Sequence, residues 1–408
     1  MKAYERLMRY ARVHTSSRDG GDTVPSTACQ FDLARLLAEE MTALGVSDVY
    51  LDEKNCYVYG KIPATPGLED KPCIGFLAHL DTIPDEDFSG VNVAPRLVEN
   101  YDGGDIPLGD SGRVLSPKAF PHLAGLKGCS LVVTDGTTVL GADDKAGVAE
   151  IMTAAEELLR SELPHGPVAI GFCPDEEIGH GAALLDLDRF GAQLAYTLDG
   201  AGVGEIEYEN FNAAAAEVTF RGFNVHPGSA KNTMINASLV AMAFNAMLPA
   251  GDTPRDTEGY EGFFHLTDMT GNVESATLHY IIRDHDSNAF ELRKKAMLHA
   301  AALLNDRYGE GTVTVAMHEQ YRNMIEKIKP HFEVVEKAME ATRQCGLTPK
   351  PCAIRGGTDG AQLSFRGLPC PNLPTGSFGH HGPYEHAVVE QMDQCVALIL
   401  RILEAFAR

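Results

Sequence analysis

The chain has 408 residues, of which 44% are hydrophobic and 22% are charged. This composition is typical of globular proteins, and the length favours two domains over a single core. The 34 basic and 57 acidic residues give a net charge of −23. Because an acidic surface repels phosphate backbones, we expect no nucleic acid partner.

Three further features of the sequence bear on the cellular compartment. No stretch of the sequence approaches the roughly 18 to 20 continuous apolar residues of a membrane span, so no membrane partner is expected. Residues 1–17 form a charged, amphipathic pattern without the apolar core of a secretory signal. Nine cysteines occur without a CxxC pair, mostly inside apolar runs. We therefore expect reduced thiols in a cytoplasmic protein.

Helical and strand-like patterns alternate along the first 200 residues, which predicts an α/β fold with a mostly parallel sheet and helices on both faces. Residues 84–130 are rich in Gly, Pro and Asp, and we predict one long ordered loop there. The expected elements are helices within 1–45 (the second over 26–44), strands over 57–61, 73–78 and 131–134, a helix from Ala146, and strands over 168–173 and 194–198.

The pattern changes near residue 210. The order strand, helix, strand, strand, helix, strand is typical of a ferredoxin-like α+β domain, with expected bounds 214–220, 233–247, 263–268, 274–283, 287–304 and 312–316. The α/β pattern resumes after residue 320, with a helix over 330–345, a strand over 370–373 and a last helix from about 387. We predict a catalytic domain of residues 1–209 and 320–408, interrupted by an inserted domain of residues 210–319.

Five acidic or imidazole side chains follow predicted strand ends or open glycine-rich turns: His79, Asp143, Glu177, Asp199 and His381. In sheets of this class, ligands bind beyond the carboxyl ends of the strands, so these side chains can converge at one edge. Two histidines and three carboxylates suit two Zn²⁺-like ions with one carboxylate shared. Paired metal ions indicate a hydrolase, because together they activate water and hold the substrate oxygen.

Each motif alone also fits an ordinary structural role. His79 with Asp81 can form a hydrogen-bonded turn, or the carboxylate can orient a ligating imidazole. Asp143 and Asp144 can cap a helix, and either of them could face the site. Of the adjacent Glu176 and Glu177, one can bind metal while the other accepts a proton from water, unless the loop is simply solvated. Either His380 or His381 could be a metal ligand, or the two could simply lie on a surface loop. The occurrence of five such motifs on successive strand ends favours the metal site.

The motifs HLDT, TDGTTVLGADDKAG, PDEEIGHGA, EYENFNAA, VHPGSAK, IIRDHD, IRGGTDGAQLS and HHGPYE occur in this order between residues 79 and 385. Together they resemble the co-catalytic dizinc aminopeptidase, carboxypeptidase and deacylase superfamily. VHPGSAK and IRGGTDGA narrow the resemblance to its tripeptidase branch. The resemblance implies a cytoplasmic metallo-aminopeptidase that removes the N-terminal residue from tripeptides.

The resemblance also implies a role for each site residue. His79 and Asp199 would bind one Zn²⁺, Glu177 and His381 the other, and Asp143 would bridge them. The superfamily's spacings select Asp143 over Asp144 and, through HxxxE, His381 over His380. Asp81 would orient His79, and Glu176 would be the general base. Co²⁺ and Mn²⁺ are the expected substitutes for Zn²⁺.

Three residues outside the metal motifs gain roles only from the resemblance. His226 would reach across a homodimer, formed through the inserted lid domain, to hydrogen-bond the oxyanion. Arg283 and Arg355 would hold a substrate carboxylate. The alternatives are a strand-end histidine before Pro227 and two solvated arginines. Two rival functions remain open, a dizinc deacylase or dipeptidase of the same superfamily and a metal-binding scaffold without activity.

Overall fold

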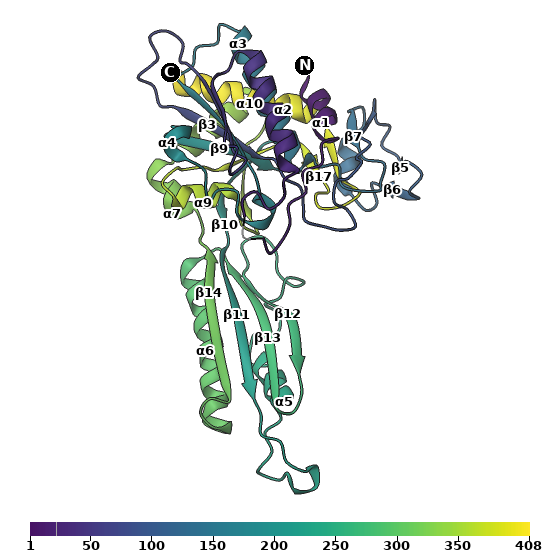
Figure 1. The fold of residues 1–408 in the computed structure, drawn as a ribbon, viewed down its shortest axis with the longest axis vertical. Coiled ribbons are helices and arrows are strands. Elements are labelled where there is room, and N and C mark those ends of the chain that lie inside the picture. Colours follow the sequence, from purple (N-terminus) through teal and green to yellow (C-terminus); the bar gives the residue numbers. More distant parts are fainter. Residues whose placement is uncertain (22) are drawn as a thin grey trace. The chain divides into compact units, whose positions relative to one another are not determined.

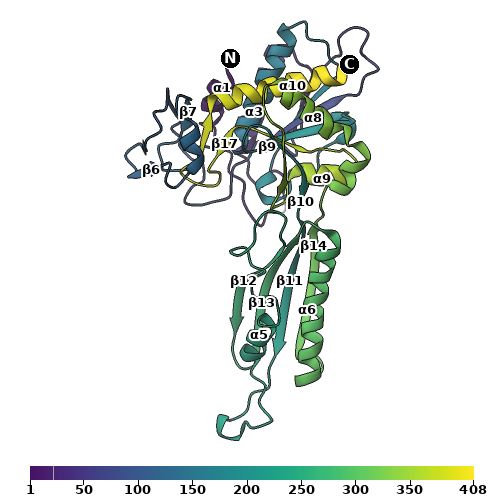
Figure 2. The ribbon, with the colours of Figure 1, turned by 180° about the vertical axis from the view of Figure 1, so that it is seen from behind.

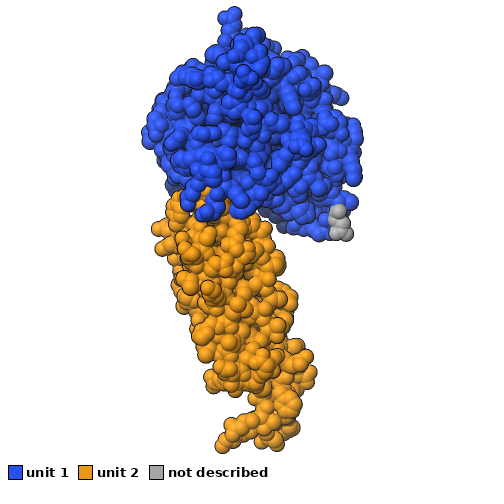
Figure 3. Space-filling model, turned by 90° about the vertical axis from the view of Figure 1, so that its left-hand side faces the viewer, with its two compact units in different colours: residues 1–208, 326–352, 358–408 blue, residues 209–325, 353–357 orange. Residues whose placement is uncertain are grey.

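The computed structural model describes residues 1–21 and 23–408, which divide into two compact units (Figure 3). Unit 1 comprises Met1–Tyr208, Glu326–Cys352 and Thr358–Arg408, and unit 2 comprises Glu209–Ile325 and Ala353–Gly357. The segment expected as an insertion, 210–319, lies inside unit 2. Residues 353–357 also belong to unit 2, which the sequence did not predict.

The large sheet has eight strands in the order β1-β2-β8-β3-β9-β16-β10-β15. Figure 1 labels three of these strands, β3, β9 and β10. Its four central strands, β8, β3, β9 and β16, are parallel, whereas β2 joins β8, β1 joins β2 and β10 joins β16 in antiparallel pairs. The α/β prediction is therefore confirmed, with parallel pairing among the four central strands. The bounds are β1 Ser47–Leu51, β2 Val58–Ile62, β3 Ile74–His79, β8 Val168–Cys173, β9 Leu194–Gly200, β10 Glu205–Asn210, β15 Lys350–Ile354 and β16 Asn372–Pro374.

Helices cover both faces of this sheet. Gly75 of β3 faces Phe190 of α4, whereas the next residue, Phe76, packs with Ile151 of α3 and Ile399 of α10. Successive strand residues point to opposite faces, so α4 lies on one face and α3 with α10 on the other. Figure 2 shows α8 beside α10. The bounds are α1 Ala3–Tyr10, α2 Gln30–Leu44, α3 Ala142–Arg160, α4 Leu187–Phe190, α7 Ile325–Ile328, α8 Glu333–Gln344, α9 Asp359–Phe365 and α10 Val389–Ala407, with 3-10 turns η1 Pro121–Gly125, η2 Glu176–Ile178 and η4 Lys329–His331.

The prediction of one long loop over residues 84–130 was wrong in part. This segment contains β4 (Arg96–Val98) and the hairpin of β5 (Ile106–Leu108) and β6 (Arg113–Leu115). A second sheet has the order β17-β18-β7-β4, with β7 at Leu131–Val133, β17 at Ser377–Phe378 and β18 at His386–Val388. These strands have two or three residues, too few for a period of two to be visible, and β7 pairs with β18 from the far end of the chain.

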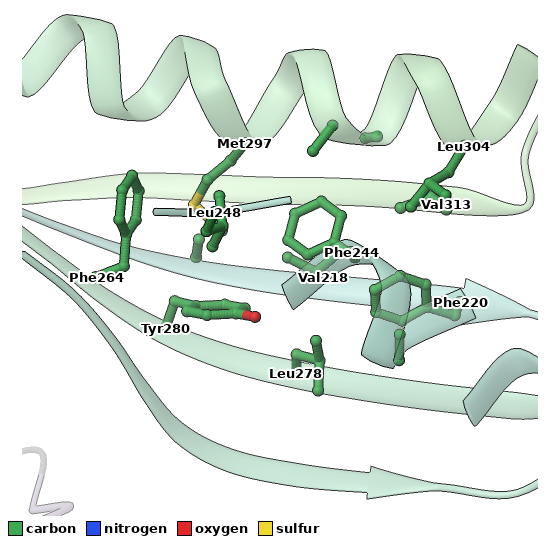
Figure 4. Close-up of a cluster of buried hydrophobic side chains, with 14 of the residues drawn as sticks. Val218, Phe220, Phe244, Leu248, Phe264, Leu278, Tyr280, Met297, Leu304 and Val313 are labelled. Carbon is green, nitrogen blue, oxygen red and sulfur yellow. The ribbon is translucent and has the colours of Figure 1, made fainter. Parts of the chain in front are cut away.

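Unit 2 contains a four-stranded antiparallel sheet in the order β12-β13-β11-β14. Its strands are β11 Asn212–Arg221, β12 Phe263–Gly271, β13 Ser275–Asp284 and β14 Val313–Tyr321, and its helices are α5 Ala237–Asn245, α6 Ser287–Tyr308 and the turn η3 Pro227–Ser229. Burial alternates along β13, so Leu278 and Tyr280 pack with Phe244 of α5 and Met297 of α6 in one cluster (Figure 4). The chain order and strand order confirm the ferredoxin-like prediction.

In the part of the chain that the structure describes, no helix is both long and apolar enough to cross a bilayer. The nine cysteines are free, and Cys56, Cys173, Cys370 and Cys395 are buried. Burial in an apolar environment raises the pKa of Cys73 to about 11 and so keeps this thiol protonated.

Candidate active site

The fold places the five predicted ligands where elements of unit 1 end. His79 is the last residue of β3, Asp199 is the penultimate residue of β9, and Glu177 lies in the turn η2 after β8. Because β8, β3 and β9 are adjacent and parallel, their carboxyl ends meet at one edge. Asp143 stands at the start of α3, and His381 lies between β17 and β18.

The structure brings all five side chains together around the carboxylate of Asp143. One of its oxygens, Oδ1, lies 3.0 Å from His79 Nε2, and the other, Oδ2, lies 3.2 Å from His381 Nε2. His79 Nε2 is also 3.6 Å from Asp199 Oδ1, and His381 Nε2 is 3.1 Å from Glu177 Oε2. A single carboxylate thus stands between two imidazoles, each with a second carboxylate beside it.

These donors fit divalent metal ions. Ligand atoms about 2.1 Å from a tetrahedral Zn²⁺ lie about 3.4 Å from one another, close to the observed separations. Two sets of three ligand atoms, from His79, Glu176 and Asp199 and from His79, Asp143 and Glu177, lie within 4.8 Å of one another. Glu177 Oε1 is buried and has no hydrogen-bond partner among the described residues. Nitrogen and oxygen donors of this kind suit Zn²⁺, Co²⁺ and Mn²⁺.

Burial and pairing shift the proton affinities of the cluster in opposite directions. Hydrogen bonds to Asp143 and Glu177 raise the pKa of His381 to about 11, while burial raises the pKa of Glu177 to about 7. Burial would also raise the pKa of Asp143, but the hydrogen bonds from His381 and His79 hold it well below its usual range. Metal ligands must be deprotonated, so a cation here competes with protons.

The structure places Asp81, the residue expected to orient His79, beside its imidazole. Its Nδ1 donates to the backbone carbonyl of Asp81 at 3.0 Å, and the Asp81 carboxylate lies farther away, at 3.4 Å. That buried carboxylate also accepts the backbone amides of Glu176 and Glu177 at 3.0 and 3.2 Å. Asp81 therefore fixes the imidazole through its carbonyl and the glutamate turn through its side chain.

Two carboxylates that sequence reasoning left without a role also shape the site. Glu385 accepts the amides of Gly141 and Asp143 at 2.7 and 2.8 Å, which positions the Asp143 backbone. Asp144 is buried and accepts the amide of His79 at 3.1 Å. Asp143 and Asp144 have non-helical backbone angles, so the regular helix begins after them, near the predicted Ala146. The HxxxE spacing ending at Glu385 was the one signal available in the sequence.

The two neighbouring histidines have different partners. His380 Nε2 is 2.9 Å from Ser377 Oγ, and its Nδ1 is 3.7 Å from Asp143 Oδ2, whereas His381 contacts both Asp143 and Glu177. His381 has φ +62°, a left-handed conformation that is uncommon for residues other than glycine. Such strained backbone is concentrated at functional sites.

A family model described as Peptidase family M20/M25/M40 matches residues 135–405. The chain belongs to peptidase family M20/M25/M40. Among its relatives, a Clostridium perfringens protein named Peptidase T is 52% identical, over 100% of this chain and 99% of that protein. A second Peptidase T, from a Geobacillus strain, is 51% identical over 98% of both chains.

A solved structure supports the fold of this M20/M25/M40 peptidase. The crystal structure of an aminopeptidase from Bacillus cereus aligns with a TM-score of 0.78 over 100% of this chain and 98% of that chain, at 24% sequence identity. This likeness shows that the two proteins share a fold.

The remaining predicted residues of this M20/M25/M40 peptidase lie in unit 2. His226 precedes the turn η3, and its Nδ1 accepts the amide of Gly228 at 3.1 Å. Arg283 is half-buried over the ring of Tyr321 and donates to the carbonyls of Ala214 and Ile282. Burial lowers the pKa of Arg283, although it stays protonated at neutral pH.

Arg355 is held by backbone oxygens of its own unit. Its guanidinium donates to the carbonyls of Gly259 and Glu261 at 2.7 and 3.0 Å, and to the carbonyl and hydroxyl of Thr257. The same group lies 5.0 Å from the ring centre of Phe211. A carboxylate that binds Arg355 would compete with these carbonyls for its N–H groups.

Proposed function

We propose that the chain is a cytoplasmic tripeptide aminopeptidase that works with two divalent metal ions, Zn²⁺ in the first instance. Unit 1 would be the catalytic domain and unit 2 a lid. The observation that carries the proposal is the Asp143 carboxylate between two imidazoles, with Glu176 in the adjoining turn. The tripeptidase motifs and the full-length identity to proteins named Peptidase T support the choice of substrate.

In this proposal His79 and Asp199 hold one ion, Glu177 and His381 the other, and Asp143 both. When bound, such ions polarise a carbonyl and lower the pKa of water. The carboxylate of Glu176 takes the proton of the attacking water and later passes it to the leaving amine. Burial, followed by the charges of Asp199 and Asp359, raises the pKa of Glu176 well above its usual range, which suits a group that must accept and return a proton.

We further propose that the protein is a homodimer joined through unit 2, with His226 of one copy stabilising the oxyanion in the other. Leu239 and Met242 form an exposed apolar stripe on α5, with exposed fractions of 62% and 59%. Met269, on the edge strand β12, is 45% exposed. An unpaired edge strand beside exposed apolar side chains is the kind of surface that a second copy covers.

Hydrolysis of peptide panels after metal removal tests the proposal. We expect exhaustive chelation to abolish hydrolysis and added Zn²⁺ to restore it, with tripeptides cleaved faster than dipeptides and tetrapeptides. Hydrolysis that survives complete removal of metal would end the proposal. Cleavage of N-acetylated but not free-amine peptides would favour the rival deacylase, and bound metal without any hydrolysis would favour a scaffold.

Arg355→Ala is expected to raise KM for tripeptides by about tenfold or more, since a hydrogen bond to a charged group contributes about 1.5–3 kcal/mol. It should also weaken discrimination against longer peptides, because a substrate of the wrong length could then satisfy the remaining contacts. Steady-state kinetics on tri- and tetrapeptides measure both effects. Arg255→Ala, at an exposed arginine of unit 2, is the control. An unchanged length profile in Arg355→Ala would contradict the role.

A further inference from the structure

The turn that carries Glu176 and Glu177 continues into a loop up to Asp186, and helix α9 is attached to this loop by two long side chains. Gln362 Nε2 donates to the carbonyl of Gly179 at 3.1 Å. Arg366 donates to the carbonyls of Ala182 and Leu185, the latter at 2.7 Å. One carbonyl of the loop is therefore held by Gln362 of α9, and two are held by Arg366, the residue that follows this helix.

The first residue of α9 also supports the loop. The Asp359 carboxylate is 4% exposed and lies against the loop backbone at Gly181. A Cβ atom added at Gly181 would stand 2.3 Å from Asp359 Oδ2, so the backbone approaches this carboxylate as closely as glycine permits.

The position of Glu176 depends on this backbone support. Its amide donates to Asp81, and within residues 1–21 and 23–408 no hydrogen bond or ion pair fixes its carboxylate. The side chain is therefore placed by the loop that bears it. Asp81 holds the loop at Glu176 and Glu177. From Gly179 to Leu185 the loop is held by Gln362 and Arg366 and by the hydroxyl of Tyr57, which donates to the carbonyl of Gly181 and accepts the amide of Leu184.

We propose that Gln362 and Arg366 are positioning residues for the reaction, which hold the 176–185 loop so that the Glu176 carboxylate stays within reach of the attacking water. This inference rests on the proposed function, because it assumes that Glu176 is the general base. Neither side chain needs to touch the substrate, and the effect on catalysis passes through the loop backbone.

The proposal predicts a loss of turnover with unchanged substrate binding. A displacement of about 1 Å at a reacting group can cost about 100-fold in rate, so we expect Gln362→Ala with Arg366→Ala to lower kcat by about 10- to 100-fold at unchanged KM. Arg366→Lys can restore one of the two carbonyl contacts and should recover part of the loss. Arg401→Ala is the matched control, since the exposed Arg401 donates to Glu404 within α10.

The experiment compares these variants as Zn²⁺-loaded full-length enzyme, with tripeptide kinetics, Zn²⁺ content and amide hydrogen exchange over residues 176–185. We expect faster exchange in this loop, lower kcat, and Zn²⁺ content equal to the wild type. If the double variant does not fold, Gln362→Ala alone, which removes a single hydrogen bond from a half-buried side chain, carries the test.

Three results would overturn the inference: loop exchange that does not change, kcat that stays constant while exchange rises, or a kcat loss that excess Zn²⁺ fully restores. The last result would place the effect on the ligand Glu177 rather than on Glu176. Failure of the proposed function is distinguishable, because in that case the wild type itself does not hydrolyse tripeptides.

Discussion

Replacement of Glu176 by glutamine is expected to lower kcat by about 10²- to 10⁴-fold, the usual contribution of a general acid–base group. Glutamine has nearly the same shape but cannot accept the proton of the attacking water. The backbone amide of Glu176 that donates to Asp81 is unchanged by the substitution, so the turn should keep its position. Tripeptide kinetics and metal analysis on the same sample measure the loss and show whether metal is retained.

The control for this variant is Glu157→Gln, at an exposed glutamate on α3 away from the cluster. It removes the same charge and should leave both kcat and metal content unchanged. Full activity in Glu176→Gln would contradict the assignment of the base. Loss of metal together with activity would instead make Glu176 a ligand, consistent with its place in one of the two ligand sets.

Arg6→Met is expected to destabilise the protein by about 3 kcal/mol, because breaking a buried ion pair leaves an uncompensated charge. Arg6 is 1% exposed and joins α1 to two other helices. Its guanidinium donates to Glu40 of α2 at 2.9 Å and to Glu156 and Thr153 of α3 at 2.6 and 3.0 Å. Methionine fills similar volume but leaves two carboxylates with fewer partners, which thermal or urea unfolding will detect.

The matched control is Arg9→Met on the same helix. Arg9 also donates to Glu40, at 2.9 Å, but its side chain is 47% exposed, and exposed ion pairs contribute less than about 1 kcal/mol. Equal destabilisation by the two variants would contradict the argument from burial.

The loss of folding stability caused by Arg6→Met should depend on pH. Burial by itself would raise the pKa of Glu156. The hydrogen bonds from the N-terminal ammonium and from Arg6 outweigh this effect and lower the pKa to about 2. Because this folded-state pKa is below the unfolded value of about 4.3, the ionised Glu156 contributes stability that is complete above pH of about 4.3 and is lost as the pH falls toward 2. We therefore expect the difference between variant and wild type to be full at pH 7 and to shrink between pH 4 and 2. A difference that is constant down to pH 2 would contradict the pairing.

Long elements with a clear period were predictable from the sequence, and short ones were not. The strand over 168–173 and the final helix follow from continuous apolar runs and a helical stripe, and both are present as β8 and α10. The short α9 was not predicted, because its seven residues span only about two helical turns, too few for a helical period to be recognised. The strands β4, β5 and β6 were missed because they are also short; β5 and β6 pair with each other in a hairpin, whereas β4 pairs with β7 farther along the chain.

The sequence by itself determined the chemistry of this protein: which side chains follow the strand ends, and hence the donor set of two imidazoles and three carboxylates. The tertiary structure alone decided how those groups meet. In the folded chain Asp143 lies between His79 and His381. The Asp81 carboxylate accepts backbone amides of the glutamate turn, and Gln362 of α9 donates a hydrogen bond to the carbonyl of Gly179 at the end of that turn. The physical reason is that residue types and their order are local, whereas distances of about 3 Å between residues far apart in the chain arise only when the sheet forms and its strand ends align.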